Sequence, residues 1–433
     1  MQARPWYQDP ALFLERLPLI CLAVIALAGL LWPDPTPLSE GFANIVRSPD
    51  ILIHDYIAVG GIRATMLNAS LVGAVGYCLL LWTKTPITGG ALAAIFIMTG
   101  FAFFGKNIVN IFPIIIGVYL YSLVRRESFQ SYVLVALFGT GLAPIGSQFA
   151  YDFGYGLPIG ILVGIASGFI IPCLAVHLLV NQQGFLLYNV GFTAGFIGTL
   201  ITSQIRAYGK TSDPTLVWSH EYHLPLTIFF ALYFVGFILL GLLLDRKSWR
   251  HLPPLMQYPG NLTTDFPALV GVAPTLINMG LVGLIGLSYI LLVGGVITGP
   301  TIGGLLTMLG FAAFGKHPRN ILPPMLGVYI GTLLKVYNAA DPGPLLAALF
   351  VTGIAPVSGY YGPLVGLVAG YLHLGMVMHV GWLQGGLNLY NNGFSGGLVT
   401  IFVVAIAKGL SGRQTAGRLK HAKERIKRRF VYR

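Results

Sequence analysis

The chain is an internal duplication, and this feature constrains its fold more than any other. Residues 55–119 align with residues 265–329 at one offset, 265 − 55 = 210. The densest match sets GFAFFGKNIVNIFPIIIGVY (Gly100–Tyr119) against GFAAFGKHPRNILPPMLGVY (Gly310–Tyr329). Composition bias does not produce so many identities in one register, so we expect two copies of one structural unit. Such repeats are the common blueprint of transporters and channels.

Two further blocks recur towards the end of each copy. The pattern T-G-[LI]-A-P occurs at Thr140–Pro144 and, at an offset of 212, at Thr352–Pro356. The pattern H-x4-Q-x-G-x2-L-Y-N-x-G-F-x2-G occurs at His177–Gly195 and, at an offset of 202, at His379–Gly397. These blocks predict a first membrane repeat at 12–205, a linker at 206–224, a second membrane repeat at 225–410 and a basic tail at 411–433.

The residue composition places both repeats in a membrane. Hydrophobic residues make up 55% of the chain and charged residues 9%, whereas a soluble domain carries about 25% charged residues. Runs such as 17–32 and 226–244 approach the roughly 20 apolar residues that span a bilayer as a helix. Short alternating segments typical of a membrane barrel do not occur. We therefore predict an all-α polytopic membrane protein.

The loop charges predict that the two repeats have opposite orientations. The loop after the first helix, 33–50, carries Asp34, Glu40 and Asp50 against Arg47, whereas the equivalent loop of the second half, 245–251, is basic. Because positive loops stay in the cytoplasm, the two loops should lie on opposite sides of the membrane. Each half has about seven apolar segments. Five can cross while two are re-entrant or broken, or all seven can cross.

The net charge of +12 is concentrated at one end of the chain. Residues 408–433 contain ten Lys or Arg and one Glu, which gives 10 − 1 = +9 and leaves about +3 for the rest. We interpret the tail as a cytoplasmic segment that contacts anionic lipid rather than nucleic acid.

The duplicated polar residues are the candidates for a solute path. The Tyr-Asn pairs interrupt apolar segments, and each asparagine is suited to cap the helix that follows it. The histidines would meet near the pseudo-two-fold axis if they face inward; the alternative is a satisfied core histidine. Small residues before a proline predict a broken or re-entrant helix, with an ordinary kink as the alternative. The candidate path residues are Tyr188, Asn189, Tyr390, Asn391, His177, His379, Gln182, Gln384, Thr140, Pro144, Thr352 and Pro356.

A second group of duplicated residues suggests contacts with ions. Lys106 and Lys316 follow glycine at a predicted helix break, where they can point into a cavity towards an anion; the slightly favoured interpretation is a lysine that snorkels to the headgroups. The aspartates lie near predicted helix starts, where capping is the favoured role. The candidate ion contacts are Asp55, Asp265, Lys106, Lys316, Asn110, Asn320, Asn68 and Asn278.

The motifs typical of membrane enzymes do not occur. The chain has no HExxH, GxSxG or Walker motif, and we expect no catalytic activity, no metal site and no cofactor. The symmetric duplication of the polar residues also disfavours an enzyme, which usually needs an asymmetric acid and base.

The chain resembles a bacterial membrane family known only as a domain of unknown function. The resemblance rests on the two GFAxFGK…N…P…GVY blocks and the two LYNxGF segments. A weaker resemblance, to urea transporters, rests on YN-x-GF at 188–192 and 390–394; the proline-rich signature of that family does not occur. These resemblances imply the bacterial inner membrane, re-entrant helices and a homo-oligomer, either a trimer or a dimer. The loop charges of the inverted repeats predict that both termini of this multi-pass protein lie in the cytoplasm.

The sequence thus predicts a transport protein, channel-like or a secondary transporter, for a small polar solute. The path would lie between the two repeats. The alternative within transport is a proton- or cation-coupled carrier of a small anion. From another class, an intramembrane enzyme or a structural membrane component stays open.

Overall fold

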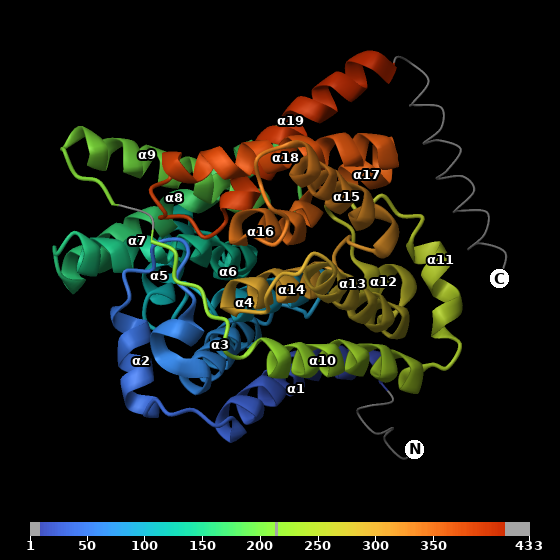
Figure 1. Cartoon of the computed structure of the whole chain (residues 1–433), viewed down its shortest axis with the longest axis horizontal. Helices are drawn as coiled ribbons and strands as arrows, with labels where there is room; N and C mark the ends of the chain where they lie inside the picture. The colour runs from blue at the N-terminus through green and yellow to red at the C-terminus, as the bar shows by residue number, and fades with distance from the viewer. Residues whose placement is uncertain (1–8, 213–214, 412–433) are drawn as a thin grey trace.

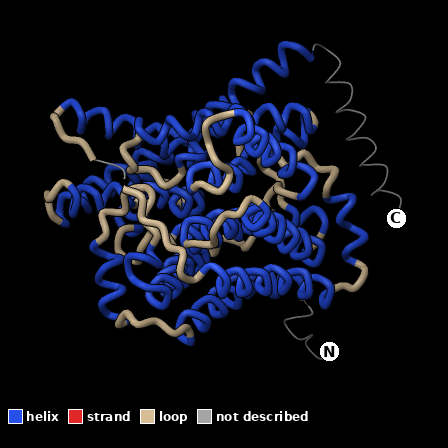
Figure 2. Tube along the Cα trace, in the orientation of Figure 1, coloured by secondary structure: helices blue, strands red, loops and turns tan. Residues whose placement is uncertain are grey.

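The computed structural model describes residues 9–212 and 215–411, which form helices joined by loops, with no strand among these residues (Figure 2). Helix boundaries follow local signals. Asp9 caps α1 by accepting from the amides of Ala11 and Leu12, with Pro10 in the first turn. Thr88 caps α4, and Thr298 and Thr301 form a capping box at α14. The basic tail lies outside the described residues, apart from its first position.

The helices of the first repeat come before residue 208 (Figure 1). Their bounds are α1 Pro10–Leu31, α2 Leu38–Arg47, α3 Tyr56–Trp82, α4 Gly89–Phe101, α5 Ile111–Arg125, α6 Val133–Gly139, α7 Pro144–Ser147, α8 Leu157–Gln182 and α9 Asn189–Ala207.

The helices of the second repeat follow in the same order. Their bounds are α10 His223–Leu244, α11 Leu252–Leu255, α12 Phe266–Val270, α13 Val272–Leu292, α14 Gly299–Phe311, α15 Pro318–Leu334, α16 Pro342–Phe350, α17 Ala355–Tyr361, α18 Pro363–Leu383 and α19 Asn391–Ser411.

The described helices confirm a polytopic membrane protein. Eight of them are long and apolar enough to cross a membrane, and a ninth span results if the pair bent by 42° at 133–152 counts as one. Helices α4 and α14 have 13 residues each, about 20 Å at 1.5 Å per residue. They are therefore too short to cross a hydrocarbon layer of about 30 Å alone.

The two repeats pack in the same way. Helix α1 packs on α3 as α10 packs on α13, and α5 packs on α8 as α15 packs on α18. The short helices α4 and α14 lie side by side near the centre of the molecule (Figure 1). All 13 residues of each are buried, so these helices form the core between the repeats.

Reciprocal contacts show that a pseudo-two-fold axis relates the repeats. A Cβ added to Gly89, at the start of α4, would lie 2.1 Å from the carbonyl oxygen of Ala313 after α14. A Cβ on Gly299, at the start of α14, would lie 2.5 Å from that of Phe103 after α4. The two helices are therefore antiparallel. Helices α9 and α19 cross on the same axis, where the Phe192 and Phe394 rings stack at 5.7 Å.

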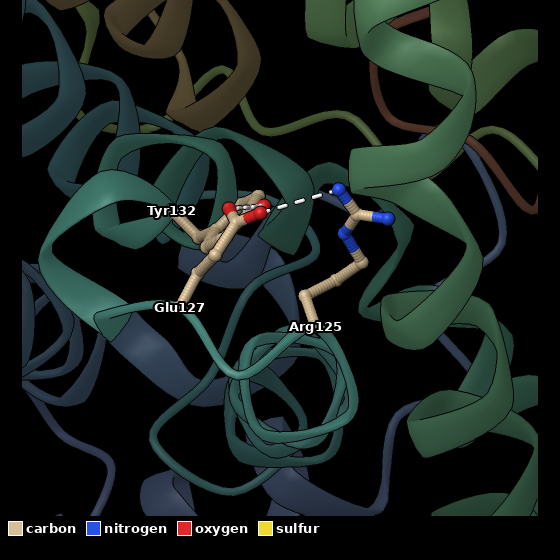
Figure 3. A network of polar contacts seen from close by, with 3 residues as sticks. All are labelled: Arg125, Glu127 and Tyr132. Atoms are coloured by element: carbon tan, nitrogen blue, oxygen red, sulfur yellow. Dashed lines mark hydrogen bonds and ion pairs between the residues drawn. The ribbon is translucent and has the colours of Figure 1, made fainter.

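One cluster of exposed polar side chains makes local contacts. At the end of α5, Arg125 donates to Glu127 at 3.2 Å, and the Tyr132 hydroxyl donates to the same carboxylate (Figure 3). Exposed pairs of this kind contribute little to stability, so a substitution at Glu127 should leave the fold intact.

Candidate functional site

Each repeat contains a sharp turn that carries a lysine, and the two lysines occupy equivalent positions. The turns follow α4 and α14, and each needs glycine because Gly105 and Gly315 have φ of +133° and +128°. Asn68 Nδ2 donates to the carbonyls of Ala102 and Lys106 at 2.8 and 2.9 Å. Asn278 makes the equivalent bonds to Ala312 and Lys316, both at 2.8 Å.

A second pair of asparagines closes the same turns. Asn110 Oδ1 accepts from the amide of Asn107 and its Nδ2 donates to the Gly105 carbonyl at 3.0 Å. Asn320 repeats this with the residue 317 amide and the Gly315 carbonyl. All four asparagines predicted as ion contacts therefore hold backbone, and their role is to position the lysines.

Both lysines point into the protein. Lys106 and Lys316 are fully buried, so the snorkelling interpretation is wrong. Lys106 Nζ donates to the hydroxyl of Tyr390 at 2.6 Å. Lys316 Nζ donates to the hydroxyl of Tyr188 and, at 2.8 Å, to that of Thr352. Each lysine thus binds the tyrosine of the other repeat.

Each lysine also lies against aromatic rings. The nitrogen of Lys106 is 5.3 and 4.9 Å from the ring centroids of Phe101 and Tyr390, and that of Lys316 is 4.7 and 5.1 Å from those of Tyr188 and Phe311. Ring faces attract a cation, but they carry no net charge. Within residues 9–212 and 215–411 neither ammonium forms a salt bridge.

The T-G-x-A-P breaks hold the tyrosine segments in place. Each break is a 3-10 turn, Thr140–Leu142 or Val351–Ile354. The chain bends by 42° across the first break, whereas Pro342–Tyr361 continues as one apolar span across the second, so the predicted broken helix is confirmed in the first repeat only. The carbonyl of Gly141 accepts from the amide of Leu389 at 3.1 Å, and that of Gly353 from Leu187 at 3.0 Å. The carbonyls at the breaks therefore bind the other repeat instead of facing a solute path.

Glycine is required at both breaks because the tyrosine rings cover them. A Cβ on Gly141 would lie 2.2 Å from the ring of Tyr390, and one on Gly353 would lie 2.2 Å from the ring of Tyr188. The threonine hydroxyls before these glycines are buried and donate to the preceding turn, Thr140 to Leu137 and Thr352 to Leu349 at 2.6 Å each.

A cavity of about 320 Å³ lies on the pseudo-two-fold axis between the repeats. Equivalent aromatic residues of the two repeats line it in pairs. These are Phe101 with Phe311, at an offset of 210 residues, and Phe138 with Phe350, at an offset of 212 residues. Tyr188 and Tyr390 close it in front of the two lysines. Other paired walls are Leu187 with Leu389 and Gly191 with Gly393. Ile97 and Thr307 form a further equivalent pair with different residue types, as do Val190 and Asn392, and seven wall residues have no equivalent in the wall: Leu134, Val135, Leu179, Asn189, Leu262, Thr263 and Phe314.

Asn189 and Asn391 begin their helices, α9 and α19, but the predicted side-chain capping is wrong for Asn189, whose helix has no side-chain cap. Asn189 Nδ2 instead donates to the Ala175 carbonyl at 3.0 Å, and Asn391 Nδ2 to that of Val377 at 3.3 Å. Both Oδ1 atoms are buried without a hydrogen-bond partner among the described residues. Asn189 lines the cavity.

The predicted histidines are not brought together. His177 and His379 are exposed on α8 and α18, so the expectation that they face inward is wrong. His379 Nδ1 contacts the carbonyl of Gly375 in its own helix at 2.8 Å. Gln182 and Gln384 are buried, but neither lines the cavity.

The aspartates cap helices, as the favoured interpretation expected, but they do so across the repeat boundary. Asp55 Oδ1 accepts from Ile57 in its own α3 at 3.0 Å and from Gly299 of α14 at 3.2 Å. Asp265 Oδ1 accepts from Gly89 of α4 at 2.9 Å. Both side chains therefore fix the central helices, away from the cavity.

Sequence reasoning missed the aromatic walls and the crossing of the lysines. Phe101 and Phe311 are part of the duplicated block, and their recurrence was the available signal. The exchange of partners between repeats had no signal, because the offset aligns equivalent residues and does not say which repeat each one contacts. Asp50, whose buried carboxylate accepts from Tyr56 and Asn110, was missed for a different reason: the second repeat has no equivalent carboxylate.

No curated protein and no solved structure matched the chain. One family model did, over residues 35–207 and 244–409, so the matched segments follow the two repeats and cover most of the chain. The chain therefore belongs to the family described as "Protein of unknown function (DUF1576)".

Proposed function

We propose that the protein is a membrane carrier for a small organic anion with an apolar body, which binds in the cavity between the repeats. The observation that carries the proposal is the pair of buried lysines behind the tyrosines of that cavity. Neither has an acidic partner among the described residues. Removing an ammonium from water costs several kcal/mol, and an anion in the cavity would supply the missing negative charge.

The cavity walls favour an apolar body for this solute. Aromatic and aliphatic side chains together form most of the wall, with Asn189 and Thr307 among the few polar groups. A small neutral solute such as urea would leave most of its hydrogen bonds unmade there, at about 1–3 kcal/mol for each buried polar group. Among the transport alternatives, the geometry therefore favours the carrier of a small anion.

The tyrosines are suited to relay the lysine charge. A hydroxyl oxygen that accepts from an ammonium keeps its own proton available as a donor. Tyr188 and Tyr390 reach the cavity wall while the lysine nitrogens lie behind them. A carboxylate or sulfonate at either end would accept from the hydroxyl and approach the ammonium. The two ends give one equivalent head-group position in each repeat.

The proposal includes transport rather than catalysis, a bacterial inner membrane and both termini in the cytoplasm. The reciprocal packing of the repeats supports it, since such repeats form the site of many secondary transporters. The predicted homo-oligomer stays a prediction.

Flux through proteoliposomes tests the proposal. Benzenesulfonate carries a permanent charge, and benzenesulfonamide is its uncharged analogue of nearly the same shape. We expect the full chain to transport the sulfonate and to transport the sulfonamide and urea at least tenfold more slowly. Lys106→Met and Lys316→Met should each abolish sulfonate flux, whereas Glu127→Gln at the exposed network should not. Equal flux of charged and uncharged probes, or none of the sulfonate, overturns the proposal.

A further inference from the structure

The first repeat contains a buried carboxylate that the proposed anion site does not use. Asp50 lies in the loop between α2 and α3 and is 1% exposed. Its Oδ1 accepts from the hydroxyl of Tyr56 at 2.6 Å, and its Oδ2 accepts from Nδ2 of Asn110 at 2.9 Å and of Asn107 at 3.4 Å. It forms no salt bridge among the described residues.

The backbone at Asp50 is one that glycine favours. Its φ is +57°, and the equivalent residue of the second repeat, at 50 + 210, is Gly260 with φ +84°. A side chain in this left-handed region costs on the order of 1 kcal/mol, although aspartate tolerates it better than most residues. The first repeat therefore places an acid where the shared backbone suits glycine.

Two of the polar neighbours of Asp50 occur only in the first repeat, whereas Asn110 recurs as Asn320. Tyr56 corresponds to Phe266, and Ser147, at an offset of 212, to Gly359. In the second repeat backbone fills the space: a Cβ on Gly260 would lie 2.0 Å from the Gly315 carbonyl oxygen. The duplicated scaffold thus closes this position in one repeat and holds a hydrogen-bonded acid in the other.

Asp50 is joined to the turn that carries Lys106. Asn110 Nδ2 lies within hydrogen-bonding distance of three acceptors: Asp50 Oδ2, the Gly105 carbonyl at 3.0 Å and Ser147 Oγ at 3.2 Å. An amide nitrogen has two hydrogens to donate, so these acceptors compete. A change at the carboxylate therefore changes how firmly Asn110 holds the backbone beside the lysine.

We propose that Asp50 is the proton-binding group of the carrier, which links proton uptake to the position of the Lys106 turn. The inference rests on the proposed transport function. The ligand is a proton rather than a metal ion because the carboxylate is surrounded by O–H and N–H donors, whereas a metal ion needs oxygen atoms that face it as ligands.

Protonation replaces an acceptor with a donor. The carboxylate gains one O–H bond with a proton from water and becomes a neutral carboxylic acid. The protonated oxygen then donates, so one of the bonds from Asn107 or Asn110 is lost, and the Ser147 hydroxyl can accept instead. Burial raises the pKa of Asp50 to about 7, against the opposing effect of hydrogen bonds from Tyr56, Ser147, Ser48 and Asn110, so the group titrates near neutral pH.

The other titratable groups around Asp50 are few. Tyr56 comes from α3, and His54 is reached through Ser48, whose hydroxyl lies 3.0 Å from its Nδ1. The charge of Asp152 acts on His54. The turn before α5 presents Asn110 and α7 presents Ser147, neither of which titrates. The side chain of Lys106 points to Tyr390.

Infrared difference spectroscopy of the full chain in lipid tests proton binding without any transport. Acidification from pH 8 to pH 5 should produce a carboxylic-acid band from a buried group. Burial also raises the pKa of Asp55 to about 7, so the Asp50 contribution is the part of the band that Asp50→Asn and Asp50→Gly, which copies the second repeat, remove and that Asp55→Asn and Glu127→Gln keep. A wild type without the band, or a band of wild-type size in either Asp50 variant, overturns the proposal.

Uptake of benzenesulfonate into proteoliposomes tests the link to transport. An inward pH gradient of one unit can drive about tenfold accumulation per proton. We expect accumulation in the wild type, and in Asp50→Asn only equilibration of the probe. Accumulation by Asp50→Asn overturns the coupling. If the wild type carries no probe, the proposed function fails, while the infrared result still decides whether Asp50 binds the proton.

Discussion

The two lysine sites differ by one hydrogen bond, and this difference yields a quantitative prediction. Lys106 Nζ has one hydroxyl partner, Tyr390, whereas Lys316 Nζ has two, Tyr188 and Thr352. Tyr390→Phe therefore removes the partner of Lys106, while Tyr188→Phe leaves Lys316 bound to Thr352 at 2.8 Å. Both substitutions keep the ring that covers the facing glycine.

The magnitudes follow from what each change leaves unpaired. A buried donor without a partner costs about 1–3 kcal/mol, and the net contribution of a hydrogen bond that is partly replaced is about 1 kcal/mol. We expect Tyr390→Phe to lower the free energy of unfolding by about 2 kcal/mol and Tyr188→Phe by about 1 kcal/mol. The difference, about 1 kcal/mol, lies above the usual effect of a surface substitution.

Equilibrium unfolding in mixed detergent micelles, followed by circular dichroism, measures both variants under one condition. The double variant Tyr188→Phe with Thr352→Val removes both hydroxyl partners of Lys316. Its loss in free energy of unfolding should equal that of Tyr390→Phe. Equal losses for the two tyrosine variants, or a larger loss at Tyr188, would refute the assignment of one partner to Lys106 and two to Lys316.

Three further predictions concern the same elements. Lys106→Met should raise the free energy of unfolding by about 1–4 kcal/mol, because a buried charge without a counter-charge is removed. A lower free energy of unfolding in the same experiment would contradict this prediction and show that the ammonium stabilises the fold. Gly141→Ala should cost about 1–3 kcal/mol by overpacking against the tyrosine ring, whereas Gly236→Ala on α10, where a Cβ meets no atom within 4 Å, should change stability little in the same assay. Burial raises the pKa of Asp50 from 3.8 to about 7, so the unfolded chain releases this proton at lower pH than the folded chain does. The wild type should therefore lose stability relative to Asp50→Asn between about pH 4 and pH 7 and change no further above that range. Thermal melts of both proteins measure this difference, and a constant difference across the range would contradict the assignment.

Many helix breaks and helix starts of the fold were predictable because they occur in both repeats. The duplicated blocks identified the turns at Lys106 and Lys316, the 3-10 breaks and the start of the last helix of each repeat. Recurrence shows that a residue type is needed twice, and the apolar composition shows that the helices face lipid. Together these indicate where the chain breaks inside a membrane protein.

The direction of the side chains was not predictable from the same signals. His177 occupies a position as recurrent as that of Lys106, yet the first is exposed and the second is fully buried. In an apolar helix with lipid on one face and protein on the other, hydrophobic periodicity does not distinguish the two faces, because both are apolar. The destination of a polar side chain then depends on which helix covers it, and that is a tertiary contact.

The departures from symmetry have a consequence for a carrier built from repeats. In the predicted inverted orientation, exchanging the conformations of the two repeats turns a state open to one side into a state open to the other. Identical repeats would give both states the same free energy. The extra bond from Lys316 to Thr352 exists in one repeat, and a net hydrogen bond of about 1 kcal/mol biases such an equilibrium about fivefold, since 1.4 kcal/mol is tenfold. Asp50, placed where the other repeat has Gly260, makes the bias depend on pH because one repeat alone can bind the proton. In the proposed carrier, symmetry would therefore build the anion site twice, and these differences would bias which side of the membrane it faces at rest.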